Sequence, residues 1–124
     1  MSYFQVIISI QDGNDPPVFV QSVYQAHVAE SATPGTRVVS VVAVDKDVRP
    51  PNNEFTYSIL GGDTTNAFKI DPHTGSIETV LALDRETQSV YNITIGAIDN
   101  GTPSQTGTSQ VIIREHRSRL SNTI

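Results

Sequence analysis

The sequence predicts an all-β protein that folds as a two-sheet sandwich of about seven short strands. Runs of β-branched and aromatic residues alternate with polar ones, most clearly over 90–98, where Tyr91, Ile93 and Ile95 share one face. Clusters of proline, glycine, asparagine and aspartate separate these runs, as turns do. No segment shows the helical period, and the 124 residues suit one domain.

The turn signals divide the chain into a series of expected strands. These strands cover 4–10, 18–28 with a kink near Gln21 and Ser22, 37–44, 55–60, 68–70, 76–80, 90–98 and 108–113. Residues 18–113 already supply a complete sandwich. We therefore expect residues 1–11 to be the last strand of a preceding domain or a leader, and residues 114–124 to form a flexible polar tail.

Composition excludes several classes of protein. The net charge of −5 and the pI near 4.9 argue against a nucleic-acid binder, which usually has a basic face. The absence of cysteine rules out disulfides, thiol catalysis and cysteine-ligated zinc. No apolar run approaches the roughly 18 residues that span a bilayer, and no signal-peptide pattern is present. We expect Met1 to start an expressed fragment, with any signal or membrane anchor outside this chain.

Acidic residues recur at expected strand ends and loops. They are Asp12-Gly13-Asn14-Asp15, Glu30, Asp45-Lys46-Asp47, Asp84-Arg85-Glu86 and Asp99. Alone, each would be read as a turn residue that bonds its own backbone. The loops of a sandwich gather at two poles, where converging carboxylates repel by about 1–4 kcal/mol per pair. A cation would offset this repulsion. Six to eight hard oxygens suit Ca²⁺, whereas the three histidines lack zinc-site spacing.

The order of these motifs resembles a cadherin repeat. The matching runs are NDPPVF (14–19), AES around Glu30, AVDKD (43–47), FKIDPHTGSIET (68–79), LDRE (83–86) and AIDNGTP (97–103). The resemblance implies a seven-stranded Greek-key β-sandwich of the immunoglobulin-like, cadherin type. It makes 12–17 a calcium-binding linker and 18–113 the repeat. Because the chain has no tryptophan and a short DPP linker, it is closer to protocadherin or Fat/Dachsous-like members than to the outermost strand-swapping domain.

The resemblance also assigns calcium ligands at the two poles. At the N-terminal pole it implies Asn14, Asp15, Pro16 through its carbonyl, Asp45, Asp47, Asn52 through its carbonyl, and Asp99. At the C-terminal pole it implies Glu30, Asp84 and Glu86, which would face the next linker. That second site is expected to be incomplete in this chain, because basic residues such as Arg114 stand where an acidic linker belongs.

The function implied is calcium-dependent cell–cell adhesion by one extracellular repeat of a single-pass plasma-membrane protein. Calcium between repeats would stiffen a multi-domain rod. The implied partners are adjacent repeats in cis or another cadherin in trans, with no nucleic acid, no small-molecule substrate and no enzymatic activity. The membrane would be reached only through a transmembrane segment outside this chain.

Two other functions are weighed against adhesion. An aromatic sugar platform would favour a calcium-binding sandwich of a microbial adhesin or carbohydrate-binding protein, yet aromatics are 6% of the chain and tryptophan is absent. A hydrolase domain would use carboxylate pairs as acid and base, and a deep cleft lined by Asp84, Glu86 or Asp99 would favour it. No nucleophile motif such as GxSxG occurs in the sequence.

A few residues stand outside these schemes. Asn92-Ile93-Thr94 and Asn100-Gly101-Thr102 are acceptor patterns for N-glycosylation, with Asn92 on the polar face of its strand. His27 and His73 are expected to be ordinary surface or turn residues.

Overall fold

All the secondary structure in the described part of the chain is β-strand. The computed structural model describes residues 15–45, 54–63, 65–84, 86, 88–101 and 103–116. The strands are β1 (Val18–Phe19), β2 (Val23–Ala29), β3 (Arg37–Ser40), β4 (Ala43–Val44), β5 (Phe55–Gly61), β6 (Phe68–Ile70), β7 (Ser76–Thr79), β8 (Val90–Asp99) and β9 (Thr106–His116). Within these residues no helix could cross a membrane. The expectations for residues 1–11, Asn14, Asp47 and Asn52 lie outside the described part.

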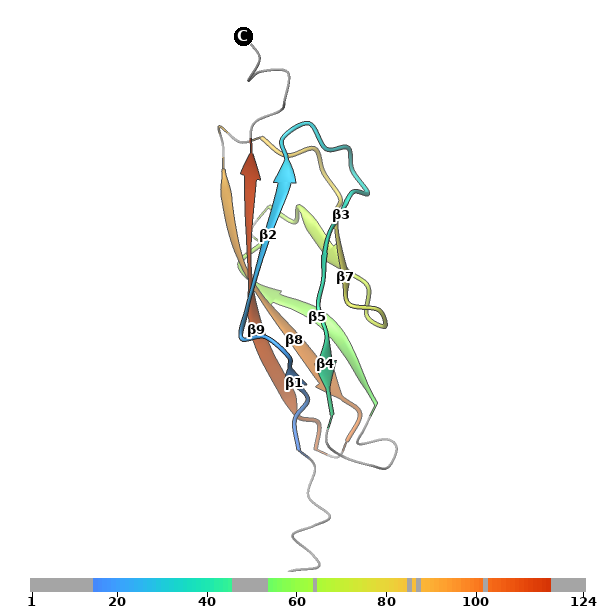
Figure 1. Ribbon diagram of the computed structural model, residues 1–124. Helices are drawn as coiled ribbons and strands as arrows, with labels where there is room; N and C mark the ends of the chain where they lie inside the picture. Colours follow the sequence, from blue (N-terminus) through green and yellow to red (C-terminus); the bar gives the residue numbers. More distant parts are fainter. Residues whose placement is uncertain are drawn as a thin grey trace, which may run out of the picture.

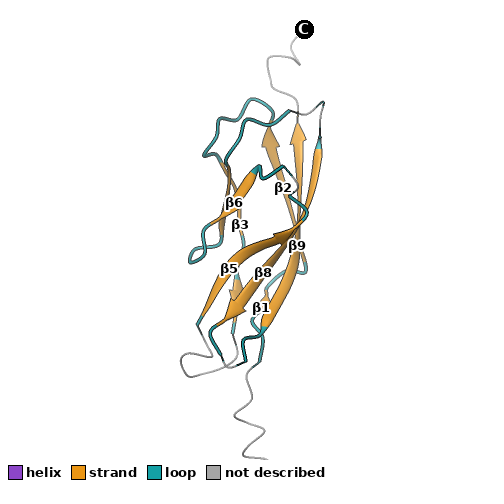
Figure 2. Ribbon diagram, turned by 180° about the vertical axis from the view of Figure 1, so that it is seen from behind, coloured by secondary structure: helices purple, strands orange, loops and turns teal. Residues whose placement is uncertain are grey.

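The strands form the two layers of an elongated sandwich, which confirms the predicted fold class (Figures 1 and 2). One layer is a four-stranded sheet in the order β2-β9-β8-β5, in which β2 runs parallel to β9 and the other pairs are antiparallel. The other layer contains the antiparallel sheet β3-β7-β6 and the short β1–β4 pair. The strands labelled β8 and β9 run most of the length of the molecule in Figure 1.

The expected long strands at 18–28 and 37–44 are each split in two. The first run kinks at Gln21 and Ser22, as predicted, so that β1 pairs with β4 while β2 moves to the other sheet beside β9. The second run breaks at Val41 and Val42, between β3 and β4. One run of sequence thereby supplies strands to two sheets, a common way of closing the side of a sandwich.

The core is built from the inward positions of the long strands. On β8, Tyr91, Ile93 and Ile95 are at most 4% exposed, and register pairs join Tyr91 to Ile113 and Ile93 to Val111. Burying each such side chain contributes about 1.5–3 kcal/mol. Val41, Tyr57, Phe68, Ile93 and Ile95 are buried in this core, and Val38 and Ile59 pack partly buried against them.

Two tyrosine hydroxyls secure β4, which is only two residues long. The Tyr24 hydroxyl donates to the Val42 carbonyl at 3.1 Å and accepts from the Val42 N–H at 3.3 Å. The Tyr57 hydroxyl accepts from the Ala43 N–H at 3.0 Å. Phe19 packs its ring against both tyrosines, with centroids 6.4 and 6.0 Å away. Side chains thus replace part of the backbone ladder and fix the strand that leads to the N-terminal pole.

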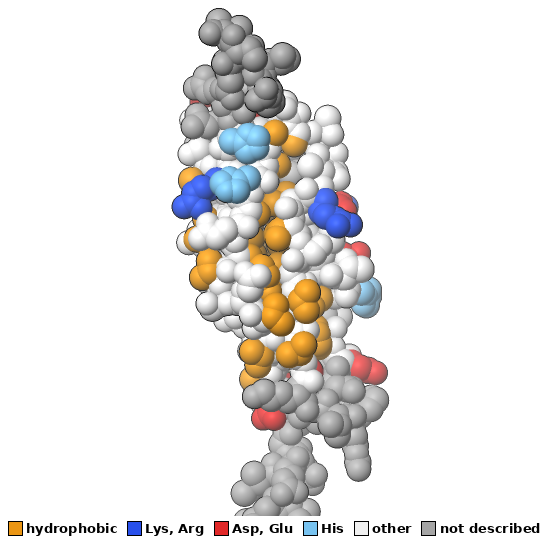
Figure 3. Space-filling view, in the orientation of Figure 1, with side chains coloured by type: hydrophobic (Ala, Val, Ile, Leu, Met, Phe, Trp, Pro, Cys, Tyr) orange, Lys and Arg blue, Asp and Glu red, His pale blue; other side chains and the backbone are white. Residues whose placement is uncertain are grey.

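An apolar face lies on the outside of β1 and β4. Val18, Val20, Val42 and Val44 are 47–60% exposed. Val18 is the register partner of Val44, and the Val20 N–H donates to the Val42 carbonyl, so the four are neighbours. In Figure 3, hydrophobic side chains gather in the lower half of the molecule, where Figure 1 places these two strands. This valine face adjoins the end of the sandwich from which β1 begins.

The strand β9 is longer than the sequence predicted. Residues 114–116 were assigned to a flexible tail, but they extend β9 to His116, and this part of the prediction was wrong. The parallel pairing with β2 continues from His27–Arg114 to Ala29–His116, and Arg114 Nη1 donates to Gln25 Oε1 at 2.8 Å. Polar composition suggested a tail. The two-residue alternation nevertheless continues, with residue 115 buried between the two exposed side chains.

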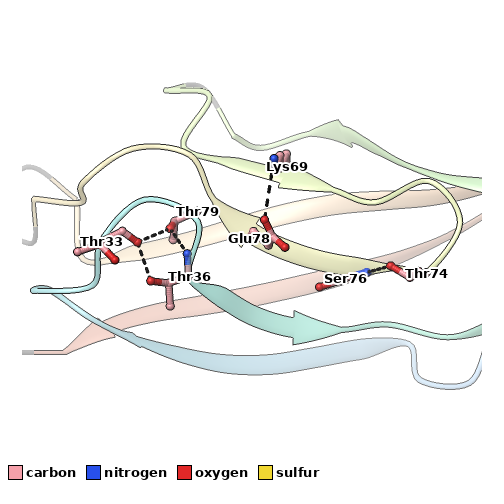
Figure 4. A network of polar contacts seen from close by, with 7 residues as sticks. All are labelled: Thr33, Thr36, Lys69, Thr74, Ser76, Glu78 and Thr79. Atoms are coloured by element: carbon pink, nitrogen blue, oxygen red, sulfur yellow. Dashed lines mark hydrogen bonds and ion pairs between the residues drawn. The ribbon is translucent and has the colours of Figure 1, made fainter.

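A threonine network fastens the loop after β2 onto β7 (Figure 4). Thr79, 1% exposed, donates its hydroxyl to the Thr33 carbonyl at 3.1 Å and accepts from the Thr36 N–H at 3.1 Å. The Thr36 hydroxyl donates to the same carbonyl at 2.6 Å. The nearby Lys69–Glu78 pair at 3.9 Å is largely exposed and contributes little. The hydroxyl of Thr79 therefore adds two side-chain bonds to the backbone bonds that already join this loop to Thr79, which run from the Gly35 N–H to the Thr79 carbonyl and from the Thr79 N–H to the Thr36 carbonyl.

We predict that Thr79→Val lowers the free energy of unfolding by about 1 kcal/mol, because it keeps the shape but removes two hydrogen bonds of the hydroxyl, while the Thr36 N–H and the Thr33 carbonyl keep the bond that joins them. Chemical denaturation measures the change. Thr108→Val, at an exposed position on β9, is the matched control and should stay within about 0.5 kcal/mol of wild type. Equal effects of the two substitutions would contradict the role given to Thr79.

The turn between β6 and β7 depends on an aspartate. Asp71 Oδ1 accepts from the Thr74 N–H at 2.9 Å and from the His73 N–H at 2.8 Å. The bond from Thr74, then that from His73, favours the charged form and lowers the pKa of the Asp71 carboxyl below its ordinary value. Gly75 ends the turn with φ of 76°, a conformation that glycine adopts easily.

The lowered pKa gives a defined pH dependence. The folded state binds the Asp71 proton less tightly than the unfolded state, so its contribution to stability is present above the ordinary pKa of about 3.9 and is lost as pH falls through the folded value. Asp71→Asn should remove this dependence. Denaturation of the wild type and of Asp71→Asn between pH 2 and 6 measures this dependence. A difference in free energy of unfolding that does not change with pH would contradict the role of the Asp71 charge.

Candidate metal centre

Four strands each place an acidic residue at their end in the inward register. The inward positions of β2, β4, β8 and β9 are apolar or small along the strand. Glu30 and Asp45 stand two residues beyond the last inward residue of β2 and of β4, respectively. Asp99 and Glu115 occupy the last inward positions of β8 and β9. Since side chains alternate across a sheet, each of these carboxylates continues the row that forms the core. Each therefore lies at the rim between the two layers.

The strand directions send Asp45 and Asp99 to the N-terminal pole. The antiparallel β1–β4 pair matches Val18 with Val44, so Asp45 lies opposite the segment 15–17 that enters β1. On the other sheet Phe55, the first residue of β5, is the register partner of Asp99. Figure 1 shows the start of β1 and the ends of β4 and β8 at the same lower end of the molecule. Asp15 and Pro16 are exposed at this end.

The loop after β8 fixes one oxygen of the Asp99 carboxylate. Asp99 is 2% exposed, and its Oδ1 accepts from the N–H groups of Gly101 at 3.1 Å and Gln105 at 2.9 Å. The Ser104 hydroxyl donates to the Asp99 carbonyl at 2.8 Å, and the Asn100 N–H donates to the Glu54 carbonyl at 2.9 Å. These bonds hold the carboxylate in one orientation before any ligand arrives.

The acids of this pole fit a hard cation. The Oδ2 atoms of Asp45 and Asp99 are both shielded from solvent. Burial disfavours a carboxylate unless positive charge or donors offset it, and carboxylate oxygens are ligands that Ca²⁺ prefers. Among the described residues no three acidic or histidine side chains lie close enough to hold an ion together. The described part therefore supplies only some of the predicted ligands, since Asn14, Asp47 and Asn52 lie outside it.

Parallel pairing of β2 and β9 brings two further acids to the opposite end. Val28 is the register partner of Glu115, and the Glu30 N–H donates to the His116 carbonyl at 2.8 Å. Strand β8 begins at this end, because the Glu115 N–H donates to the Ser89 carbonyl at 2.9 Å. Glu115 is 4% exposed, whereas Glu30 is half-buried. This is the C-terminal pole.

Asp84 and Glu86 lie in the loop that precedes β8, and both are exposed. Asp84 Oδ1 accepts from the Glu86 N–H at 3.0 Å, and the Asp84 carbonyl accepts from the Gln88 N–H at 3.0 Å. The predicted residues of the C-terminal pole thus come from the end of β2 and from the loop before β8. The turn-like bonds shape this loop.

The negative charge of the C-terminal pole affects the pKa of Tyr91. Burial raises the pKa of the Tyr91 hydroxyl, and the negative charges of Glu115, Asp63 and Asp84 raise it further. Asp63 has a structural role, because its two oxygens accept from the Ala67 and Phe68 N–H groups at 2.9 Å. The negative charges of Glu115, Asp63 and Asp84 therefore act in the same direction as burial on the pKa of the Tyr91 hydroxyl.

Glu115 is the acid that sequence reasoning missed, because it was assigned to the tail. A signal for it was available in a tetrapeptide that occurs twice, at Gln5–Ile8 and Gln110–Ile113. Aligning the two copies places Glu115 opposite Ile10, an apolar position, and Arg117 opposite Asp12. The second copy therefore carries an acid, Glu115, two residues before the position at which the acidic linker begins in the first copy.

Comparison with known proteins decides the family. The profile of the cadherin domain matches residues 24–114. The chain belongs to the cadherin family. Protocadherin Fat 4 of Mus musculus is 44% identical over 108 residues, which are 87% of this chain and 2% of that protein. Protein dachsous of Drosophila melanogaster is 41% identical over 114 residues, 90% of this chain and 3% of the relative. The expected likeness to Fat/Dachsous-like members is confirmed.

Solved cadherin structures share the fold. A structure of mouse clustered PcdhgC3 EC1-3 superposes with a TM-score of 0.78 and 34% identity, covering 84% of this chain and 34% of that one. The crystal structure of mouse cadherin-23 EC22-24 gives a TM-score of 0.76 and 34% identity, covering 83% of this chain and 33% of that one. This cadherin domain is thus similar to single repeats within much longer relatives.

Family membership carries several general statements. Cadherin domains take part in cell adhesion and bind Ca²⁺ between consecutive repeats. The family is in general non-enzymatic, and the relatives are membrane cadherins with extracellular repeats. In multi-repeat protocadherins, repeats contact neighbouring repeats and other cadherins. The hydrolase and microbial-adhesin alternatives are not favoured by any of these relatives.

We predict that Glu115→Gln lowers the pKa of Tyr91 toward its ordinary value but not fully, because burial is the larger cause. Asp84→Asn should lower it less, and Asp71→Asn, at the remote β6–β7 turn, should leave it unchanged. Resonances of the tyrosine ring followed against pH by NMR measure these shifts. If Glu115→Gln left the pKa of Tyr91 unchanged, the charge of Glu115 would have no effect on this hydroxyl, and the prediction would be contradicted.

Proposed function

We propose that this chain is one extracellular repeat of a longer cadherin, and that its two poles close calcium sites against neighbouring repeats to stiffen an adhesive rod. The observation that carries the proposal is the inward placement of acids at both ends of one core. Asp45 and Asp99 stand at one end, and Glu30 and Glu115 at the other. Carboxylates placed at both rims of one core are what a module joined at both ends by cations requires, because positive charge offsets the cost of shielding them from water.

At the N-terminal pole the chain's own residues would supply most of one site. Asn14, Asp15 and the Pro16 carbonyl would come from the linker, Asp45, Asp47 and the Asn52 carbonyl from the loop after β4, and Asp99 from the end of β8. Calcium would contribute positive charge that offsets carboxylate repulsion and joins the loops of two repeats.

Contacts of the described residues support this assignment for two of the proposed ligands. Asp99 is held by two backbone N–H groups through Oδ1, so its orientation does not depend on the ion. Asp45 follows β4, which the Tyr57 hydroxyl secures through the Ala43 N–H. Ligands held in place in advance lose little conformational entropy on binding, so more of the binding energy reaches the junction.

At the C-terminal pole Glu30, Asp84 and Glu86 would face the linker of a following repeat. These residues are half-buried or exposed, as a half-site awaiting another domain requires. The partners we propose are the adjacent repeats in cis and another cadherin in trans. The proposed location is the extracellular part of a single-pass plasma-membrane protein, in keeping with the membrane cadherins it resembles.

We predict weak calcium binding by the isolated chain, with a Kd on the order of 10⁻⁴–10⁻³ M, because the ligands of a neighbouring repeat are missing. With Kd near 1 mM, about 10 mM Ca²⁺ should raise the free energy of unfolding by roughly 1.4 kcal/mol. The chain should remain folded with chelator, since its core does not include the metal. Thermal melts with calcium and with chelator measure the difference.

Asp45→Asn should abolish most of this calcium-dependent stabilisation, because it removes one ligand charge with little change of shape. Asp71→Asn, with the same change of charge at an exposed turn, is the matched control and should keep it. Asp84→Asn should also keep it, since that residue belongs to the other pole. Equal losses in all three variants would mean that calcium acts through net charge and not through the proposed site.

A further inference from the structure

The outer face of the four-stranded sheet exposes an asparagine in the middle of regular structure. Asn92 lies on β8 between Tyr91 and Ile93, which are 4% and 0% exposed, and its own side chain points to solvent. One neighbour is β9, where Ile112 is its register partner. On the other side β5 has ended, since its last register pair is Gly61 with Thr94. Asn92 therefore sits where the sheet is open on one side.

The segment that follows β5 passes this open side, and a glycine allows it to approach the backbone of Asn92 closely. A Cβ on Gly62 would lie 2.1 Å from the Asn92 carbonyl oxygen, and Gly62 has φ of 88°. Only glycine permits this close approach and this conformation without strain. The crossing segment consequently carries no side chain at the point nearest Asn92.

The residue two positions on completes a modification motif on the same face. Thr94 follows Asn92 by one full strand period, so both side chains lie on the outer face of the sheet. Gln110 Nε2 donates to the Thr94 hydroxyl at 3.2 Å. Asn-x-Thr with a middle residue other than proline, here Ile93, is the acceptor pattern for N-linked glycosylation.

We propose that Asn92 carries an N-linked glycan. The donor is a lipid-linked pyrophosphoryl oligosaccharide of the secretory pathway. A bond forms between Nδ2 of Asn92 and C1 of the first sugar, the bond from C1 to the phosphate oxygen breaks, and the lipid pyrophosphate leaves with that electron pair. Nδ2 releases one proton, and nothing is oxidised or reduced. The proposal relies on secretion, which the proposed function implies.

The order of the strands makes Asn92 accessible to modification during synthesis. Its register partner is on β9, which follows β8 in the chain. Until residues 106–116 have emerged, β8 cannot form this pairing, and the register with the earlier strand β5 reaches only as far as Thr94, so Asn92 has no register partner at that stage. In the folded protein the glycan would then cover Val90, 45% exposed, and the half-buried Ile112 beside it.

The second acceptor pattern begins in a different environment. Asn100 is exposed, but its N–H donates to the Glu54 carbonyl and it directly follows Asp99 at the N-terminal pole. A glycan there would stand at the proposed junction with the preceding repeat. The modification therefore belongs on Asn92, where it leaves the proposed junction clear, and not on Asn100.

The test is expression of the chain behind a secretion signal in mammalian cells, with the protein recovered from medium and from lysate. Peptide N-glycosidase in heavy-oxygen water should increase electrophoretic mobility and leave a labelled aspartate at position 92, found by mass spectrometry. Asn92→Gln and Thr94→Ala should each abolish the mobility shift. Thr94→Ser, which keeps the hydroxyl, and Asn100→Gln should retain it.

Reading lysate as well as medium keeps the test informative if a variant folds poorly, because the glycan is added before folding is complete. Folded, secreted wild-type protein with unmodified Asn92 would overturn the proposal, and so would loss of all glycan in Asn100→Gln. Calcium titration of unglycosylated protein made in bacteria is a separate measurement. Absence of calcium binding would count against the proposed function and would not affect the glycan proposal. Absence of the glycan would count against the glycan proposal and would not affect the calcium sites.

Discussion

The alternation of side chains across each strand is the constraint on which both the core and the poles of this cadherin domain depend. On β8 the inward row begins at Tyr91 and ends at Asp99, so the pairing that buries the isoleucines also buries the carboxylate. A shift of one residue would turn the core to solvent and remove Asp99 from the pole at the same time. Stability and the placement of Asp99 at the pole therefore cannot be separated on this strand.

Strand direction then distributes the acids between the two ends. Strand β9 runs parallel to β2 and antiparallel to β8, so Glu30 and Glu115 reach one pole while Asp99 reaches the other. If β2 paired antiparallel to β9, Glu30 would lie at the wrong end. The kink at Gln21 and Ser22, which passes the chain from one sheet to the other, makes the parallel pairing feasible.

Sequence reasoning reached the fold because the period of two is strong where the core is thick, as on β8. It failed where the polar composition of a segment disagreed with the two-residue alternation of its burial. Arg114, Glu115 and His116 are all polar, and only the burial of the middle residue shows that the strand continues. Thr79 and Asp63 were also missed, because their importance comes from backbone groups distant in sequence or in the next turn, which no local pattern reveals. The ligand assignments came from resemblance to the family and not from spacing alone.

The two poles differ in how firmly they are built, and the difference follows from where each acid stands. Asp99 is tied by loop N–H groups, and the short strand before Asp45 is secured by tyrosine hydroxyls, so the N-terminal pole is organised by the domain itself. Asp84 and Glu86 are exposed and share a bond within their own loop. In the proposed rod, the rigid half of each junction would be an N-terminal pole, and the adaptable half would be a C-terminal pole. The stiffness of the rod would then be set by the ion and by the adaptable half, because the rigid half already has its geometry.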